Sequence, residues 1–170
     1  HKVLSVSYTQ EHKSSTMSSK KIWGSIASCV LLLIFFMRIQ VISFQFATET
    51  LYFREQSFDL SWIHSVEKEE WIEYYRVDGD ALLLARTKFK TFGAGVPSDA
   101  EQVELKDGFV IMTINEPYEE LNLTISEYVD TTIVIGDEQL KLYHFGEPYE
   151  TVLIKAEKLP VWQFLKEEFL

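Results

Sequence analysis

Five polar residues that are capable of chemistry lie close together in the sequence WIHSVEKEEWIEYYRV, residues 62–77. They are His64, Ser65, Glu67, Glu73 and Tyr75. Imidazole, hydroxyl and carboxylate groups serve in general acid–base catalysis, in nucleophilic catalysis and in metal binding. The segment therefore raises three alternatives: a reactive site, a ligand pocket, or a polar network that holds a hairpin together.

Two neighbouring strands are expected to carry these residues. Apolar and polar side chains alternate over 58–66, FDLSWIHSV, and the segment 71–77, WIEYYRV, reads as the returning strand. The polar residues KEE at 68–70 read as the turn between the two strands. The pattern predicts a β-hairpin with the candidate residues on both of its strands.

Strand geometry places the candidate residues on defined faces. Successive side chains of a strand point to opposite faces, so His64 is expected on the inner face, opposite Ser65 and Glu67. If the apolar ends of the second strand mark its inner face, Glu73 and Tyr75 also point inward. A carboxylate beside an imidazole in a low dielectric favours the charged pair, which raises the histidine pKa and lowers the glutamate pKa.

The same geometry weighs against two kinds of chemistry. His64 cannot easily reach the hydroxyl of Ser65, because adjacent strand residues face opposite ways. Metal binding through His64, Glu67 and Glu73 lacks a recognisable ligand spacing. We therefore expect no catalytic residue, no metal and no cofactor, and the structural network and the ligand pocket both remain open.

A glycine-rich loop, TFGAGVP, follows at residues 91–97. Gly93 and Gly95 permit positive φ angles or a close approach of the backbone, and backbone N–H groups in such turns can hold an anion. No helical pattern follows, which excludes a P-loop and a dinucleotide-binding fingerprint. By itself the loop predicts a tight turn.

Charge and cysteine content exclude further classes of function. Residues 1–46 carry five basic groups and one acidic group, whereas 47–170 carry 11 basic and 25 acidic groups, a formal charge of −14. So acidic a body repels phosphate backbones and is not expected to bind nucleic acid. Cys29 is the only cysteine, which excludes intrachain disulfides, thiol catalysis in the body and CxxC metal sites.

The N-terminal region is expected to attach the chain to a membrane. Residues 22–46 are rich in apolar side chains and predict a transmembrane anchor, with a cleaved signal sequence as the alternative. The preceding lysines favour a cytoplasmic N-terminus, which makes 47–170 extracytoplasmic. We expect residues 1–21 to form a disordered cytoplasmic tail and Met17 to be the true start of translation.

The body, residues 47–170, reads as a series of short strands. Asp-Gly and Gly-Asp turn signals separate segments of alternating or apolar residues up to about residue 158. Only LPVWQFLKEEFL, residues 159–170, has a helical pattern. The fold class predicted is all-β, an antiparallel sandwich or open barrel of about eight strands with a short C-terminal helix.

The motifs together resemble those of a bacterial family of uncharacterised domains. Its members are small anchored or secreted proteins that carry an H-S-V-E…E-x-Y strand pair followed by an F-G-A-G-x-P loop. The matching positions here are His64, Ser65, Val66, Glu67, Glu73, Tyr75, Phe92, Gly93, Ala94, Gly95 and Pro97. Genes of this family commonly lie beside those of TAXI-type TRAP transporters, which are tripartite ATP-independent periplasmic uptake systems.

The resemblance implies a non-catalytic accessory component of such a transporter. Its partners would be the TRAP permease and the TAXI-type solute-binding protein, and it would act by docking or assembly through the motif residues. The alternative is a membrane-anchored domain that binds a small anion or carboxylate. In that alternative His64, Glu73 and Tyr75 line a pocket that the loop 93–97 closes.

Overall fold

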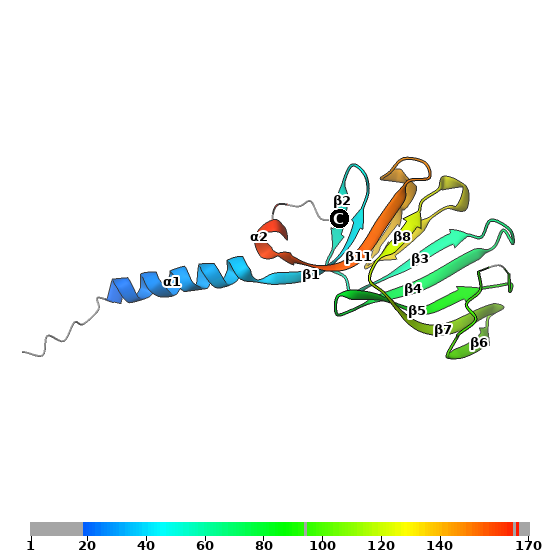
Figure 1. Ribbon diagram of the computed structural model, residues 1–170, viewed down its shortest axis with the longest axis horizontal. Helices are drawn as coiled ribbons and strands as arrows, with labels where there is room; N and C mark the ends of the chain where they lie inside the picture. The colour runs from blue at the N-terminus through cyan, green and yellow to red at the C-terminus, as the bar shows by residue number, and fades with distance from the viewer. Residues whose placement is uncertain (1–18, 94, 165, 167–170) are drawn as a thin grey trace, which may run out of the picture. The chain divides into compact units, whose positions relative to one another are not determined.

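The computed structural model describes residues 19–93, 95–164 and 166. The chain divides into two compact units, residues 1–36 and residues 37–170 (Figure 1). The described part of the first unit is one helix, α1 (Ser19–Phe36). The second unit holds every described strand.

Two antiparallel sheets build the second unit. The four-stranded sheet has the order β2 (Thr50–Phe53), β1 (Arg38–Gln45), β11 (Thr151–Pro160), β8 (Leu121–Thr124). The seven-stranded sheet has the order β10 (Glu138–Lys141), β9 (Thr132–Ile135), β3 (Ser57–Ile63), β4 (Glu70–Asp78), β5 (Ala81–Phe89), β7 (Phe109–Tyr118), β6 (Gln102–Lys106) (Figure 1). Two 3₁₀ turns, η1 (Glu127–Val129) and η2 (Leu142–His144), and the short helix α2 (Val161–Phe164) complete the described elements.

A hydrophobic core joins the two sheets. Phe44 of β1 packs edge-to-face on Phe58 of β3, with ring centroids 5.4 Å apart, and Phe58 stacks on Tyr75 of β4 at 5.1 Å. Phe44 and Phe58 belong to different sheets, so their contact crosses the interior between them. Alternation produces this core, because residues such as Val110 and Met112 of β7 point inward while their neighbours point outward.

The prediction of an all-β antiparallel fold with a short C-terminal helix is confirmed, but the strand count is wrong. The described residues form eleven strands rather than about eight. The difference comes from short strands such as β6 and β10, and from two strands that precede residue 57. The helix α2 covers only Val161–Phe164 of the predicted 159–170, and residues 165 and 167–170 lie outside the described residues.

The predicted helix over 22–46 is wrong in its second half. The helix α1 ends at Phe36, and residues 38–45 form β1, which pairs with β11 and β2. Within the described part of the chain, no helix combines the length and the apolar character that crossing a membrane requires. The folded β unit therefore begins at Met37 rather than at residue 47. Residues 1–18 of the predicted tail lie outside the described residues, and 19–21 open α1.

Candidate functional site

The turn between β3 and β4 carries the first candidate residues. The strand β3 ends at Ile63, so the predicted strand over 58–66 is too long. The His64 backbone N–H donates to the carbonyl of Glu69 (2.8 Å), and the Lys68 N–H donates to the carbonyl of His64 (2.9 Å). Lys68 has a positive φ of 56°. These bonds fix His64 at the base of a closed turn. The alternation of side chains between the two faces of a strand therefore no longer determines which way its side chain points.

His64 is paired with Glu67 within this turn. The imidazole Nδ1 contacts the Glu67 carboxylate Oε2, and both side chains are largely buried, at 17% and 20% exposure. The Val66 backbone N–H also points at Nδ1, at 3.4 Å. The imidazole nitrogen must donate to the carboxylate or accept from the amide, so the two contacts compete for it. The turn thus supplies His64 with a carboxylate neighbour three residues away, and that neighbour is not Glu73.

The glycine-rich loop packs against the same turn. A Cβ atom at Gly93 would overlap the carboxylate of Glu67, so any other residue at this position requires the Glu67 side chain to move. Gly95 has a positive φ of 86°, which glycine adopts without strain. Ala94 lies outside the described residues. The structure thus brings the turn and the loop together at one end of the seven-stranded sheet, as the order of the two motifs suggested.

Two exposed apolar side chains lie on these segments. Val66 of the turn is 71% exposed, and Phe92 of the loop is 63% exposed. Ser65 is also exposed, whereas Pro97 is half-buried. We call this surface the turn–loop patch: His64, Ser65, Val66, Glu67, Phe92 and Gly93.

An aromatic stack supports the turn–loop patch. His64 stacks on Trp71 at 5.7 Å, Trp71 stacks on Phe89 at 4.6 Å, and Phe89 meets Phe92 edge-to-face at 5.4 Å. Within the described residues, the buried Nε1–H of Trp71 and Oε2 of Glu69 have no hydrogen-bond partner. The stack supports the patch from one side, and the two unpartnered atoms belong to residues beside the patch.

Glu73 and Tyr75 lie at a different place from the turn–loop patch. In the β3–β4 register Glu73 is opposite Leu60 and Tyr75 is opposite Phe58, whereas His64 hydrogen bonds to Glu69 beyond the end of the pairing. The candidate residues of the hairpin therefore divide between two sites. The sequence predicted one pocket lined by His64, Glu73 and Tyr75 and closed by the glycine-rich loop. The structure does not form it, because the cavity beside Glu73 and Tyr75 includes neither His64 nor a described residue of the loop.

This cavity lies between the two sheets and measures about 400 Å³. Its lining comes from β3 and β4 of one sheet, β8 of the other sheet, and the segments on either side of β8. The residues are Leu60, Trp62, Glu73, Tyr75, Tyr118, Glu120, Leu121, Asn122, Leu123, Thr124, Val129 and Thr131. Of these, only Glu73 and Tyr75 were predicted from the sequence as site residues, because alternation marks inward-facing residues without showing which strands meet.

Burial raises the pKa values of Glu73 and Tyr75, two of the polar residues in the cavity. The Tyr75 hydroxyl donates to Oε2 of Glu73 at 2.6 Å. Burial raises the pKa of Glu73 above its ordinary value, and the Tyr75 hydrogen bond offsets only part of that rise. Burial, followed by the neighbouring Glu73, also raises the pKa of Tyr75. The expected lowering of the Glu73 pKa is therefore wrong, because no imidazole lies beside it to outweigh desolvation.

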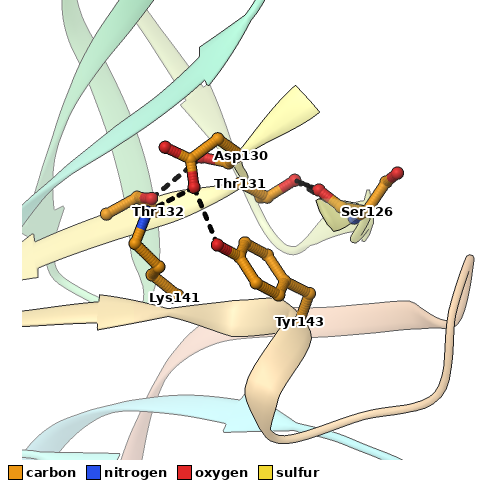
Figure 2. A network of polar contacts seen from close by, with 6 residues as sticks. All are labelled: Ser126, Asp130, Thr131, Thr132, Lys141 and Tyr143. Carbon is orange, nitrogen blue, oxygen red and sulfur yellow. Dashed lines mark hydrogen bonds and ion pairs between the residues drawn. The ribbon is translucent and has the colours of Figure 1, made fainter. Parts of the chain in front are cut away.

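A second polar network, drawn in Figure 2, lies on the segment that contributes Thr131 to the cavity. The Lys141 ammonium pairs with Oδ1 of Asp130, and the Tyr143 hydroxyl donates to the same oxygen at 2.9 Å. These bonds, Lys141 first, lower the pKa of Asp130. Next to Asp130, the Thr131 hydroxyl accepts from the Ser126 backbone N–H at 3.2 Å. The network holds the η1–β9 connection, which contributes Thr131 to the cavity. Nothing in the local sequence distinguished Asp130 from an ordinary turn residue.

Among the described residues, no hydrogen bond joins His64 to Ser65, and no cluster of three His, Cys, Asp or Glu side chains is placed to hold a metal ion. The described residues present two surfaces with room for contacts, the exposed turn–loop patch and the partly open cavity.

Comparison with known proteins places the chain in a family. A family model described as a domain of unknown function, DUF1850, matches residues 58–142. Neither a curated protein nor a solved structure shows significant similarity to the chain. The matched region runs from β3 to the start of η2, so it includes nearly all of the seven-stranded sheet, the turn–loop patch and β8. The match covers half of the 170 residues, and the protein belongs to the DUF1850 family.

Proposed function

We propose that this protein is a non-catalytic accessory component of a TAXI-type TRAP solute uptake system. It acts by docking on the permease, the solute-binding protein or both, through the turn–loop patch. The proposal draws on the resemblance of the H-S-V-E…E-x-Y and F-G-A-G-x-P motifs to those of domains encoded beside such transporters. Membership of an uncharacterised domain family is consistent with this origin.

The observation that carries the proposal is that the H-S-V-E part of the first motif meets the F-G part of the second, with exposed side chains on both segments. Glu67 of the turn packs on Gly93 of the loop, and exposed Val66 and Phe92 lie on these two segments. Protein interfaces combine exposed apolar or aromatic side chains with polar groups at their rim. Motif residues that served only the core would be buried, whereas Val66, Phe92 and Ser65 are exposed.

The charge of the body supports docking on a basic surface. Residues 47–170 carry a formal charge of −14. Complementary charge accelerates association and favours one partner over others, while added salt weakens both effects. A basic surface on the solute-binding protein or permease would complement this protein.

The proposal includes attachment to the bacterial inner membrane, with the β unit on the extracytoplasmic side. Within α1, the exposed large apolar residues run from Ile22 to Phe36 and include Trp23, Leu31 and Leu33. A helix so apolar on its surface gains stability by transferring these side chains into lipid. Because residues 38–45 belong to β1, lipid contact is confined to α1 rather than to the whole of 22–46.

Deletion and rescue test this function. Deleting the gene is expected to reduce uptake by the TRAP system while the solute-binding protein retains its affinity for solute. Wild type is expected to restore uptake, and a double variant Val66→Ser with Phe92→Ser is expected not to, at equal protein level. Unchanged uptake in the deletion strain would contradict the proposal.

A further inference from the structure

The cavity between the sheets has the size and lining of a small-molecule site. Its volume of about 400 Å³ lies within the roughly 300–1,000 Å³ that is usual for such pockets. Apolar side chains, among them Leu60, Leu121 and Val129, form much of the lining. The few polar groups converge from β4, from β8 and from the segments beside β8. A mostly apolar cavity with few polar groups is the usual form of a ligand site.

The side chains in the cavity lining that can carry a charge near neutral pH are acidic. Glu73 and Glu120 line it, and among the lining residues that the structure describes there is no lysine, arginine or histidine. Tyr75 donates to Oε2 of Glu73, and within the described residues no hydrogen bond reaches the other oxygen, Oε1. The carboxyl group therefore has an acceptor available for a ligand, while the cavity offers no cation to an anionic one.

Aromatic rings complete the lining. Trp62 stacks on Trp71 at 5.9 Å, and Tyr75 stacks on Phe58 at 5.1 Å, so both cavity rings are held in place. Tyr118 adds a third aromatic side chain. Aromatic faces attract cations and pack well on apolar or aromatic groups.

We propose that this cavity binds a small molecule that joins an apolar or aromatic body to a protonated amine, with the ammonium group on the Glu73 carboxylate. The sequence led us to expect an anion or a carboxylate as the alternative ligand. A cation takes its place in this proposal, because Glu73 and Glu120 would repel an anionic ligand.

Desolvation gives the amine its advantage. Burial raises the pKa of Glu73, which means that the ionised carboxylate is unfavourable in the empty cavity. An ammonium group that contacts Oε1 stabilises the ionised form, while the Tyr75 hydroxyl continues to donate to Oε2. A neutral analogue of the same shape cannot do this, so charge and not size alone is expected to decide affinity.

The cavity is prepared for binding by its surroundings. Asp130 lies between the lining residues Val129 and Thr131, and Lys141 and Tyr143 hold its carboxylate (Figure 2). A wall that is fixed before binding costs less conformational entropy when the ligand enters. The cavity lining includes no residue of the turn–loop patch, so ligand binding does not depend on docking.

Three probes of one shape test the proposal: 2-phenylethylamine, 2-phenylethanol and 3-phenylpropionate. Isothermal titration calorimetry with the full chain at neutral pH is expected to rank the amine first, the alcohol about tenfold weaker, and the carboxylate weakest. No binding of the amine by folded protein at millimolar concentration overturns the proposal. A preference for the carboxylate overturns it as well.

Two variants separate charge from shape. Glu73→Gln keeps the shape of the side chain and removes its charge, so it is expected to lose the roughly tenfold preference for amine over alcohol while still binding the alcohol. Glu104→Gln, at an exposed position of β6 outside the cavity, is the matched control and is expected to behave as wild type. If Glu73→Gln keeps the preference for the amine, the ammonium group does not bind at Glu73, and the proposal is overturned.

The pH dependence of the wild type gives a test that needs no variant. Tyr75 on β4, Tyr118 and Glu116 on β7, and Glu120 after β7 are the titratable groups around Glu73. Of the two partners in the ion pair, only Glu73 gains a proton as pH falls below neutrality, since the amine is already protonated. Affinity for 2-phenylethylamine is therefore expected to fall with pH while affinity for 2-phenylethanol holds. Parallel curves for the two probes contradict the ion pair.

Discussion

At the residue scale, the contact between Glu67 and Gly93 is the most restrictive feature of the turn–loop patch. A Cβ at position 93 would overlap the Glu67 carboxylate. Gly93→Ala is therefore expected to lower the free energy of unfolding by about 1 kcal/mol, the low end of the cost of overpacking, because the Glu67 carboxylate must move and give up its contact with His64. Chemical denaturation monitored by tryptophan fluorescence measures this change.

A double-mutant cycle distinguishes this contact from a general effect of glycine replacement. In the Glu67→Ala background, Gly93→Ala is expected to cost much less, because the overlapping carboxylate is gone. Gly95→Ala is the matched control, since its cost comes from a positive φ of 86° and no atom lies near its Cβ position. Equal costs of Gly93→Ala in both backgrounds would show that the contact is absent in solution.

Glu73 gives a prediction with a defined sign. Its pKa in the folded chain is raised above the ordinary 4.5 by burial, so the folded state binds its proton more tightly than the unfolded state. Stability from this group is present below pH 4.5 and is lost as pH rises toward the raised folded value. Denaturation of wild type and Glu73→Gln from acid to neutral pH is expected to show the wild type losing stability relative to the variant. A constant difference would contradict the raised pKa.

Part of the site could be predicted from residue order alone. The H-S-V-E and F-G-A-G motifs are separated by one strand of the sheet and its returning neighbour, which favours their meeting, and Glu67 does meet Gly93. The placement of His64 beside Glu73 was not predictable. Successive side chains alternate between two faces only within a strand, and β3 ends at Ile63, one residue before His64. The predicted lowering of the Glu73 pKa assumed that His64 lay beside it, and without that imidazole burial raises the pKa instead.

At the element scale, β1 explains why the N-terminal region was misread. This strand lies between β2 and β11, and Val41, Ile42, Ser43 and Phe44 are all buried. A strand buried on both faces reads as a continuous apolar run, which periodicity cannot distinguish from a helix. Only Arg38 interrupts the apolar residues at this point, and because they resume at Ile39 the interruption was not recognised as the boundary between α1 and β1.

Shortened chains test the importance of β1. Val41, Ile42 and Phe44 are completely buried, and each contributes roughly 1.5–3 kcal/mol of burial energy. Their combined loss is comparable to the net stability of about 5–15 kcal/mol of a typical domain. A chain of residues 37–170 is therefore expected to unfold cooperatively on heating, whereas 47–170 is not. A cooperative transition in the shorter chain, followed by circular dichroism, would contradict this assignment of the domain boundary.

At the scale of the whole molecule, the all-β class and the antiparallel arrangement were predictable because turn signals recur along residues 47–170. The pairing of strands into sheets of four and seven was not. The strands β8 and β11 are distant in sequence from β1, and no local pattern indicates that they join it in one sheet. For this reason the cavity between the sheets became visible only in the structure.

The acidic body makes docking sensitive to ionic strength. With a formal charge of −14 over residues 47–170, association with a basic partner is expected to weaken steadily as salt rises from about 50 to about 500 mM. Salt titration of the complex purified from native membranes measures this. Association that is unchanged or strengthened by salt would show that apolar contact, and not charge, brings the partners together.

The most direct test of the proposed function is a crosslinked pull-down from native membranes. It compares Val66→Ser and Phe92→Ser in the turn–loop patch with Val134→Ser on β9 and Tyr128→Ser in η1, which remove exposed side chains outside the patch. We predict that a TRAP permease or TAXI-type solute-binding protein is recovered with wild type and both controls, and is lost with the two patch variants. Equal recovery with all of the variants would contradict docking through the patch, and failure to recover either transporter component with wild type would contradict the proposed function.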